Sequence, residues 1–318
     1  MSRKLSRHIP AWVLGWSLPA EIGMLYTSLD HCFCVELGPV KPDDVQQLIE
    51  LRFDQAPVVT RYSTHDRPGF PEGLVTTEHL KALLHSGTPL ERDDPKIVAA
   101  TLPLEPTLGV LLETLSKSRA ALVIEEERQE TATMRWFRGL ITISDLNRQS
   151  FRSLLYTLLA EFEAGLARFL EACCPDPWDW LSQLSEEHQV RLLGYWELSK
   201  RNAVDVSPVA AATLALLLTV IGKKERLRSK LGYSSRSKFE DATGRMAKRR
   251  NQIMHPVRPL VLAVGDVAEI RETLEVVFSL CQILAKLGFM EYPRTPDGHM
   301  AVTLATTLTK PPPEPASN

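Results

Sequence analysis

Two short stretches, GLVTTEHL at residues 73–80 and GLITISDL at residues 139–146, decide how the first half of this chain folds. Each opens with a glycine and two aliphatic residues, followed by a threonine where a strand pattern changes into a helix pattern. Gly73 and Gly139 are 66 residues apart. The sequence therefore predicts an internal duplication in this half.

The segments around the two stretches support the duplication because they follow one order. In the first copy, a helix pattern at 42–53 precedes a strand pattern at 56–62, a polar loop at 63–72 and the strand-to-helix stretch. In the second copy, a helix pattern at 105–118 precedes a strand pattern at 119–126, a charged loop at 126–134 and the stretch that begins at 139. We therefore expect two helix–strand–strand–helix units.

The threonines of the two stretches have two interpretations. Asp145 follows Thr142 by three residues, which is the spacing of a capping box at the start of a helix. The same helix start, with a hydroxyl and free backbone N–H groups, also suits a phosphate, and its carboxylate suits the two hydroxyls of a ribose. The first copy has Thr76 in the equivalent place, with His79 where the acid is expected.

The pattern of Gly, two aliphatic residues, Thr, two residues and Asp in a duplicated unit resembles the tandem CBS-domain family, or Bateman module. The resemblance covers about residues 35–150. It implies two units packed around a pseudo-twofold axis, with clefts that bind AMP, ATP or S-adenosylmethionine as regulatory ligands. Carried over to this chain, the ligand-binding residues are Thr76, Thr142 and Asp145, and His79 departs from the family pattern. A module that serves only as a dimerising platform is the alternative.

Strand patterns nearly vanish after residue 150, where five helix patterns follow. They occupy residues 150–174, 185–202, 206–232, 238–255 and 266–289, with Ser150 and Ser185 as expected caps and Pro256 as a stop. We therefore expect an α+β chain: an N-terminal extension (1–34) with a short strand at 8–16, an α/β module (35–150), an all-helical bundle (151–290) and a partly disordered tail (291–318).

Composition favours a cytoplasmic protein without a membrane span. The longest uncharged run, residues 207–222, is shorter than the roughly 18–20 apolar residues of a span, and its Ser-Pro start predicts a buried helix. The start of the chain lacks a signal-peptide pattern. The five cysteines form no CxxC pair and no zinc-binding spacing, which suits a reducing compartment and predicts no metal site.

The sequence RRNQIMHP at residues 249–256 places Arg250 and His255 near the end of a predicted helix. The same spacing recurs at residues 3–8 and 294–299, outside the predicted bundle, so spacing alone carries little weight. Residues 223–258, however, contain twelve lysines and arginines and three acids, a net of +9 in a chain of net charge −2. Such asymmetry is typical of a surface for a polyanion, although a solvated basic face is the alternative.

An Arg, a polar residue and a following His in a helical bundle resemble the HEPN superfamily. The resemblance implies a metal-independent ribonuclease that works as a homodimer, of the kind found in toxin–antitoxin and antiviral defence systems, in which an antitoxin can be a partner. Carried over, Arg250 and His255 form the catalytic pair and Asn251 supports them. Arg249, Lys248 and Arg245 are the expected contacts to RNA.

The residue types suit this chemistry. An ordinary histidine titrates near pH 6.5, so it can take a proton from a ribose 2′-hydroxyl or give one to the leaving oxygen, and an arginine stabilises the charged phosphate. The sequence thus predicts a nucleotide-regulated endoribonuclease that needs no cofactor for catalysis. One alternative is a non-enzymatic regulator in which the module binds a ligand and the bundle binds RNA or a partner protein. Another is a HEPN-like bundle that binds a nucleotide or serves a partner nucleotidyltransferase.

Overall fold

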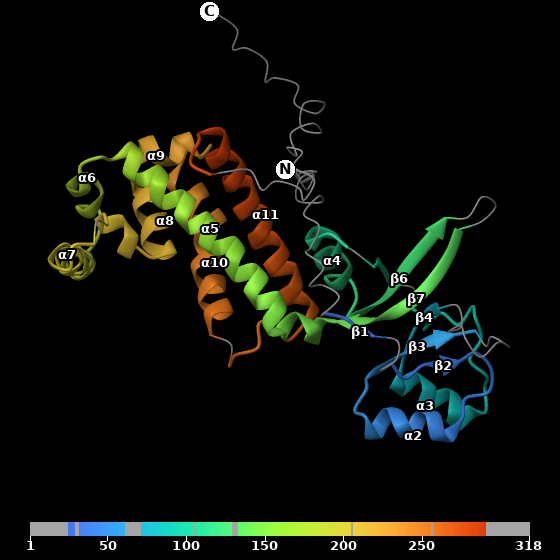
Figure 1. Cartoon of the computed structure of the whole chain (residues 1–318). Helices are drawn as coiled ribbons and strands as arrows, with labels where there is room; N and C mark the ends of the chain where they lie inside the picture. The colour runs from blue at the N-terminus through green and yellow to red at the C-terminus, as the bar shows by residue number, and fades with distance from the viewer. Residues whose placement is uncertain are drawn as a thin grey trace, which may run out of the picture. The chain divides into compact units, whose positions relative to one another are not determined.

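A computed structural model describes residues 25–28, 32–60, 71–98, 100–104, 106–128, 133–204, 206–255 and 257–290 (Figure 1). The predicted strand at 8–16, the tail and the two other Arg/His spacings lie outside these residues. The chain divides into two compact units. One, the strand-containing unit, comprises Ser17–Ser153 with Pro256–Arg271, and the other, the helical unit, comprises Leu154–His255 with the chain from Glu272 onward.

The first copy of the predicted duplication forms a three-stranded sheet with two helices. Its elements are β2 (Val35–Glu36), α2 (Pro42–Glu50), β3 (Gln55–Val59), β4 (Pro71–Thr76) and α3 (Thr77–Ser86). Strand β3 is central, parallel to β2 and antiparallel to β4. The predicted helix, strand and strand-to-helix stretch are confirmed, and the structure adds the short strand β2 before them.

The second copy repeats this topology. Its elements are β5 (Thr101–Pro103), α4 (Leu108–Leu115), β6 (Ala120–Arg128), β7 (Thr133–Thr142) and the 3-10 helix η3 (Ile143–Asn147). Strand β6 is parallel to β5 and antiparallel to β7, whose other edge pairs with β1 (Thr27–Ser28). The register shifts after Val58 in β3 and after Val123 in β6, so even this irregularity is repeated. The predicted duplication is therefore present.

Gly73 and Gly139 allow another segment to lie close against each copy. A β carbon on Gly73 would collide with the Ile97 side chain, and one on Gly139 would collide with the Thr27 carbonyl. In both copies the neighbouring backbone pairs at the residue after the glycine, through Leu74 with Val98 and through Leu140 with Thr27. The glycine that both stretches share thus has a packing cause within this chain.

The second copy departs from the predicted helix at its end. Asp145 closes a 3-10 turn through its carbonyl, which accepts from the Arg148 N–H at 3.0 Å, and Arg148 is extended. The predicted helix after Thr142 is thus a short 3-10 helix, and the next helix, α5 (Gln149–Cys173), starts separately, as the pattern at 150–174 predicted. Ser150 lies inside the first turn of α5 rather than at its cap, because that helix begins one residue earlier.

The helical unit follows the five predicted helices with two corrections. The predicted helix at 206–232 is broken, because Thr213 and Lys224 adopt extended backbone conformations and each precedes a new helix. An unpredicted short helix, α6, follows the Asp176 cap. Besides α5, the elements are α6 (Pro177–Leu181), α7 (Glu186–Arg201), η4 (Pro208–Ala211), α8 (Leu214–Lys223), α9 (Glu225–Lys230), α10 (Arg236–Met254) and α11 (Val264–Lys286).

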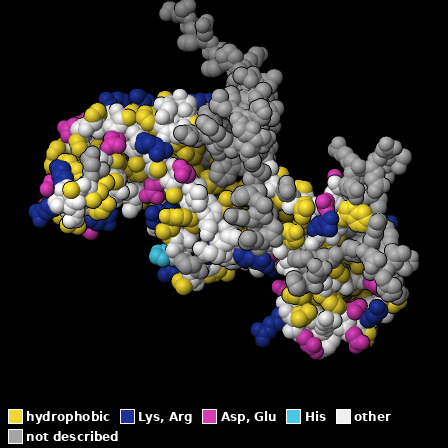
Figure 2. Space-filling view, in the orientation of Figure 1, with side chains coloured by type: hydrophobic (Ala, Val, Ile, Leu, Met, Phe, Trp, Pro, Cys, Tyr) yellow, Lys and Arg dark blue, Asp and Glu magenta, His cyan; other side chains and the backbone are white. Residues whose placement is uncertain are grey.

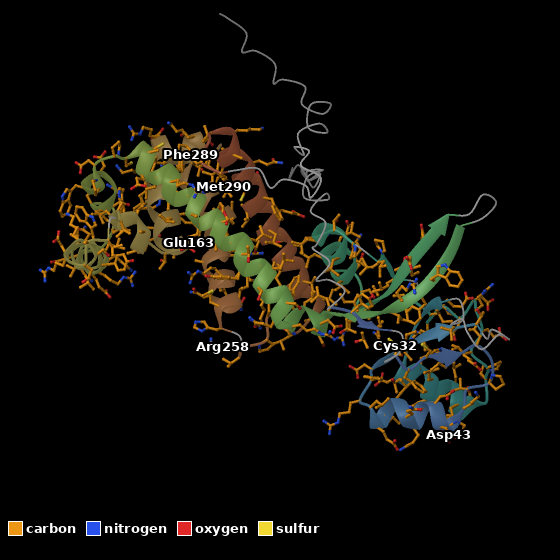
Figure 3. All side chains as sticks on the ribbon, viewed as in Figure 1. Cys32, Asp43, Glu163, Arg258, Phe289 and Met290 are labelled. Carbon is orange, nitrogen blue, oxygen red and sulfur yellow. The ribbon has the colours of Figure 1, made fainter. Side chains whose placement is uncertain are left out.

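Aromatic and glycine contacts join helices of this unit. Phe239 of α10 is fully buried, and its ring lies where a β carbon on Gly222 of α8 would come within 3.1 Å. In a second contact, Phe289 packs edge-on against Phe169 of α5, with ring centroids 5.5 Å apart. Phe289 is labelled in Figure 3. None of the helices in the described part of the chain combines the length and hydropathy needed to cross a bilayer.

Candidate functional site

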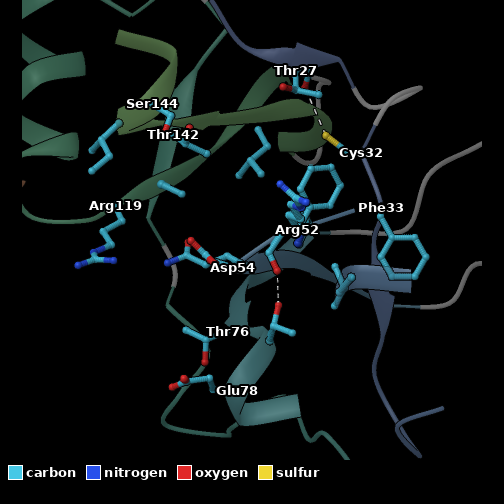
Figure 4. Close-up of a pocket in the computed structure, with 18 of the residues that line it drawn as sticks. Thr27, Cys32, Phe33, Arg52, Asp54, Thr76, Glu78, Arg119, Thr142 and Ser144 are labelled. Atoms are coloured by element: carbon cyan, nitrogen blue, oxygen red, sulfur yellow. Dashed lines mark hydrogen bonds between the residues drawn. The ribbon is translucent and has the colours of Figure 1, made fainter. Parts of the chain in front are cut away.

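A cavity of about 1040 Å³ lies within the strand-containing unit, and both copies contribute to its wall (Figure 4). The three residues predicted to bind a ligand, Thr76, Thr142 and Asp145, all line it. Thr76 ends β4 and Thr142 ends β7, so the two strand-to-helix junctions open on one space. The two repeated stretches thus contribute to one site.

In the second copy, Asp145 is committed to the backbone of its own turn. Its Oδ2 accepts hydrogen bonds from the Thr142 N–H at 2.7 Å and from the Thr142 hydroxyl at 2.9 Å. Its Oδ1 lies 2.6 Å from the Arg148 guanidinium, whose side chain is 42% exposed. Asp145 itself is only 8% exposed. The capping-box interpretation is therefore confirmed. Of the two carboxylate oxygens, only Oδ1 is available to a ligand, which has to displace the Arg148 guanidinium from it.

The first copy uses a different arrangement. The Thr76 hydroxyl caps α3 by accepting from the His79 N–H at 3.2 Å. The His79 ring lies 2.7 Å from the Asp94 carboxylate and does not line the cavity. Burial raises the pKa of Asp94, but the hydrogen bonds from His79 and the Lys96 N–H outweigh it, so the pKa is lowered. His79, which stands in the first copy where the second copy has Asp145, therefore takes no part in the cavity wall.

Three basic side chains at the cavity were not predicted from the sequence. Arg52, Lys81 and Arg119 are exposed, line the cavity, and make no ion pair or side-chain hydrogen bond with any described residue. Three acids, Asp54, Glu78 and Asp145, share the wall. Arg52 has a positive φ of 57°, a conformation rare for a residue with a side chain. Cations without partners beside two helix starts make this wall suited to an anion.

The position of Arg119 reflects the internal symmetry. The Ile143 N–H donates to the Arg119 carbonyl at 2.9 Å, just as the Thr77 N–H donates to the Asp54 carbonyl at 2.9 Å. The two copies therefore place an arginine and an aspartate at equivalent points of the cavity (Figure 4). A sequence signal existed, since Asp54 lies two residues before the predicted strand at 56–62 and Arg119 begins the predicted strand at 119–126.

The rest of the wall is partly apolar. Half-buried Phe33 and Leu140 line the cavity, with the Cys32 thiol donating to the Thr27 carbonyl at 3.3 Å. Burial raises the pKa of Cys32 to about 11, so this cysteine is a protonated thiol at neutral pH. The cavity therefore offers an aromatic face and an aliphatic surface next to its charged side, the combination typical of a small-molecule site.

The Arg/His motif lies at the C-terminal end of α10. The Arg250 guanidinium is 3.6 Å from the Glu163 carboxylate of α5, and the two side chains are 28% and 20% exposed (Figure 3). Asn251 and His255 are exposed, and His255 is the residue at which the helix ends. The arginine is thus neutralised in part by a carboxylate, while the amide and the imidazole face solvent.

The neighbouring basic residues differ in availability. Lys248 is exposed, and Arg245 is exposed but paired with Glu272 at 3.0 Å. Arg249 is only 5% exposed, and its guanidinium donates to the Gln252 side chain at 2.8 Å. Arg249 belongs to the interior of the helical unit, because its position on α10 faces inward. The expectation that it contacts RNA is therefore corrected.

The +9 segment does not form one free basic surface. Lys223 donates to the Gln183 carbonyl and Arg226 to the Cys173 carbonyl. Arg258 belongs to the strand-containing unit, where its carbonyl accepts from Arg152. Among the described residues there is also no cluster of three or more side chains suited to a metal ion. Much of the charge therefore serves local packing.

Comparison with known proteins gives matches among solved structures only. No protein-family model and no curated protein matches this chain. A hemolysin-like protein containing a CBS domain from Oenococcus oeni PSU is 14% identical over 39% of this chain and 84% of its own, with a TM-score of 0.30. A CBS domain protein from Shewanella oneidensis MR-1 is 19% identical over 39% and 92%, with a TM-score of 0.29. A functionally unknown conserved protein domain from Neisseria meningitidis MC58 is 15% identical over 39% and 73%, with a TM-score of 0.27.

Proposed function

We propose that the strand-containing unit is a tandem CBS module that binds an adenine nucleotide as a regulatory ligand. One observation carries the proposal: three basic side chains without partners and two strand-to-helix junctions line one cavity of about 1040 Å³. A cavity of this size accommodates a ligand of drug or nucleotide dimensions. Because the cations have no carboxylate partner in the described chain, a bound phosphate supplies the missing charge.

Each part of the ligand has a matching part of the wall. Arg52, Lys81 and Arg119 hold the phosphates, since guanidinium and ammonium groups form strong hydrogen bonds to phosphate oxygens. A ribose hydroxyl donates to Asp145 Oδ1 after displacing the exposed Arg148 side chain. The adenine stacks on the half-buried Phe33 ring. The charge favours AMP or ATP over S-adenosylmethionine, which has a positive sulfonium and no phosphate.

Isothermal titration calorimetry of the whole chain tests this assignment. AMP and ATP are expected to bind more tightly than adenosine or S-adenosylmethionine, and added salt is expected to weaken binding. Arg119→Ala and Arg52→Ala are each expected to weaken AMP binding about tenfold, the loss of one charge-assisted contact. Arg138→Ala is the matched control, because Arg138 pairs with Glu125 and does not line the cavity. Equal binding of AMP and adenosine contradicts the proposal.

We also propose, as a second function, that the C-terminal end of α10 cleaves RNA without a metal. The observation that favours it is the exposure of Asn251, His255 and Lys248 at one helix end, with Arg250 one turn before. His255 moves the proton of the ribose 2′-hydroxyl, and Arg250 stabilises the charged phosphate. The products are a 2′,3′-cyclic phosphate and a 5′-hydroxyl. An antitoxin partner and a dimeric cleft remain part of this second proposal.

Cleavage of RNA in EDTA separates the enzyme from a non-enzymatic RNA or protein binder. Arg250→Ala and His255→Ala are expected to abolish cleavage, while Arg236→Ala, a change at the other end of the same helix, leaves it intact. Glu163→Gln removes the carboxylate that neutralises Arg250 and is expected to tighten RNA binding. Binding without cleavage supports the regulator. The regulatory link is tested by adding AMP, which is expected to change the rate.

A further inference from the structure

Helix α7 buries few of its side chains against the described part of the chain. Leu192 and Ser199 are its only buried residues. Val190, Leu198 and Tyr195 are instead 64%, 58% and 46% exposed. Figure 2 shows exposed hydrophobic side chains between charged ones over the end of the helical unit that carries α6 and α7. Since helices in proteins are stabilised mainly by packing of an apolar face, α7 has an apolar face without a partner in the described chain.

Gly194 lies in the middle of this face. A β carbon on Gly194 would meet no atom within 4 Å, so no contact in the described chain requires a glycine there. A glycine inside an exposed helix costs about 1 kcal/mol relative to alanine. Gly244 of α10 also has space around it, but its neighbours four residues away are Glu240 and Lys248. Only Gly194 is flanked at those distances by exposed apolar side chains, Val190 and Leu198, as a close helix crossing requires.

The order of residues along this face is symmetric. Glu187, Val190, Gly194, Leu198 and Arg201 follow one another at steps of three, four, four and three residues, the spacing of one helix face. An antiparallel second copy centred on Gly194 brings Val190 against Leu198 of that copy and Glu187 against its Arg201. Neither Glu187 nor Arg201 forms an ion pair with a described residue. The face is therefore complementary to itself in both apolar contacts and charge.

We propose that this face of α7 is a homodimer interface, in which the α7 helices of two copies cross at Gly194 around a twofold axis. The partner is a second copy because the acidic end of the face lies opposite the basic end when the same face is placed antiparallel to itself. Such self-complementarity is the property of an isologous interface. A single helix pair buries less than the roughly 1,200 Å² of a standard interface, so the dimer has an affinity in the micromolar range or weaker. The inference does not depend on the proposed nucleotide or RNA functions.

Sedimentation equilibrium of the full chain tests the interface by charge exchange. The wild type is expected to dimerise with rising concentration. Glu187→Arg is expected to weaken the dimer about tenfold, because both Glu187–Arg201 pairs across the twofold axis become pairs of like charge. Adding Arg201→Glu to Glu187→Arg is expected to restore it. Glu161→Arg on α5, an exposed residue outside this face, is the control for the charge change.

A second variant pair tests the crossing point. Gly194→Glu places two carboxylates together at the twofold axis and is expected to give a monomer, while Gly244→Glu makes the same change on α10 and leaves the dimer intact. Both replace a helix glycine by a better helix former, so both variants are expected to fold. A monomeric wild type at submillimolar concentration overturns the proposal. A dimer that resists Glu187→Arg, or that the double exchange does not restore, overturns it as well.

Discussion

Replacing Asp145 by alanine is expected to destabilise the strand-containing unit by about 2 kcal/mol. Asp145 is 8% exposed, and its carboxylate accepts two hydrogen bonds from Thr142, at 2.7 and 2.9 Å. Loss of a helix cap alone costs about 1 kcal/mol, and bonds to a charged group add to this. The ion pair with Arg148 adds little, because the arginine is 42% exposed.

Hydrogen exchange measured by mass spectrometry across a urea series suits this prediction, because it separates the two units of the chain. Peptides from β7 and η3 are expected to open at lower urea in Asp145→Ala, while peptides from α10 stay unchanged. Ser144→Ala, an exposed neighbour, and Arg148→Ala serve as controls and are expected to cost less than about 1 kcal/mol. An Asp145→Ala unit as stable as the wild type refutes the view that this carboxylate is committed to its own turn.

Three further results are expected. Gly139→Ala forces a methyl group against the Thr27 carbonyl, and calorimetry should show a loss of about 1–3 kcal/mol; an unchanged melting temperature contradicts the close approach. Burial raises the pKa of Cys34 to about 12, so alkylation of this thiol at pH 8 should be at least about tenfold slower than that of free cysteine. Because the unfolded chain loses this proton first, the free energy of unfolding should fall as the pH rises above about 8.5. Rapid labelling of Cys34 in the folded protein contradicts the raised pKa. His79→Ala removes the hydrogen bond that lowers the pKa of Asp94, so the variant should be less stable near pH 6, and the difference should shrink as the pH falls below about 4. A difference that stays constant in acid assigns the effect to another cause.

The duplicated part of the fold was predictable because its information is local. The glycine and threonine of each stretch mark a close approach and a helix cap, and both features depend on a few neighbouring residues. The 3-10 turn after Thr142 was not predictable, because it depends on how Asp145 and Arg148 bond in three dimensions. The break at Thr213 has a similar origin, since the run around it is uncharged and mostly apolar and periodicity gives no boundary.

The candidate site was predictable only in part. Thr76, Thr142 and Asp145 carry a motif, and the structure brings all three to one cavity. Arg52 and Lys81 carry no motif, and only the tertiary fold places them beside those residues. In the helical unit the reverse holds. The sequence marks a run of basic residues, but burial decides which of them is available, and Arg249 faces the interior.

The most direct test of the account is hydrogen exchange of the full chain with and without AMP. The proposed site predicts that AMP protects two separate segments together, the start of α3 and the turn after Thr142, because both line one cavity. At an AMP concentration near the wild-type Kd, Arg119→Ala is expected to reduce both protections together, and Arg138→Ala neither. Protection of only one segment, or no protection at AMP concentrations that saturate binding, contradicts a shared nucleotide site between the two copies.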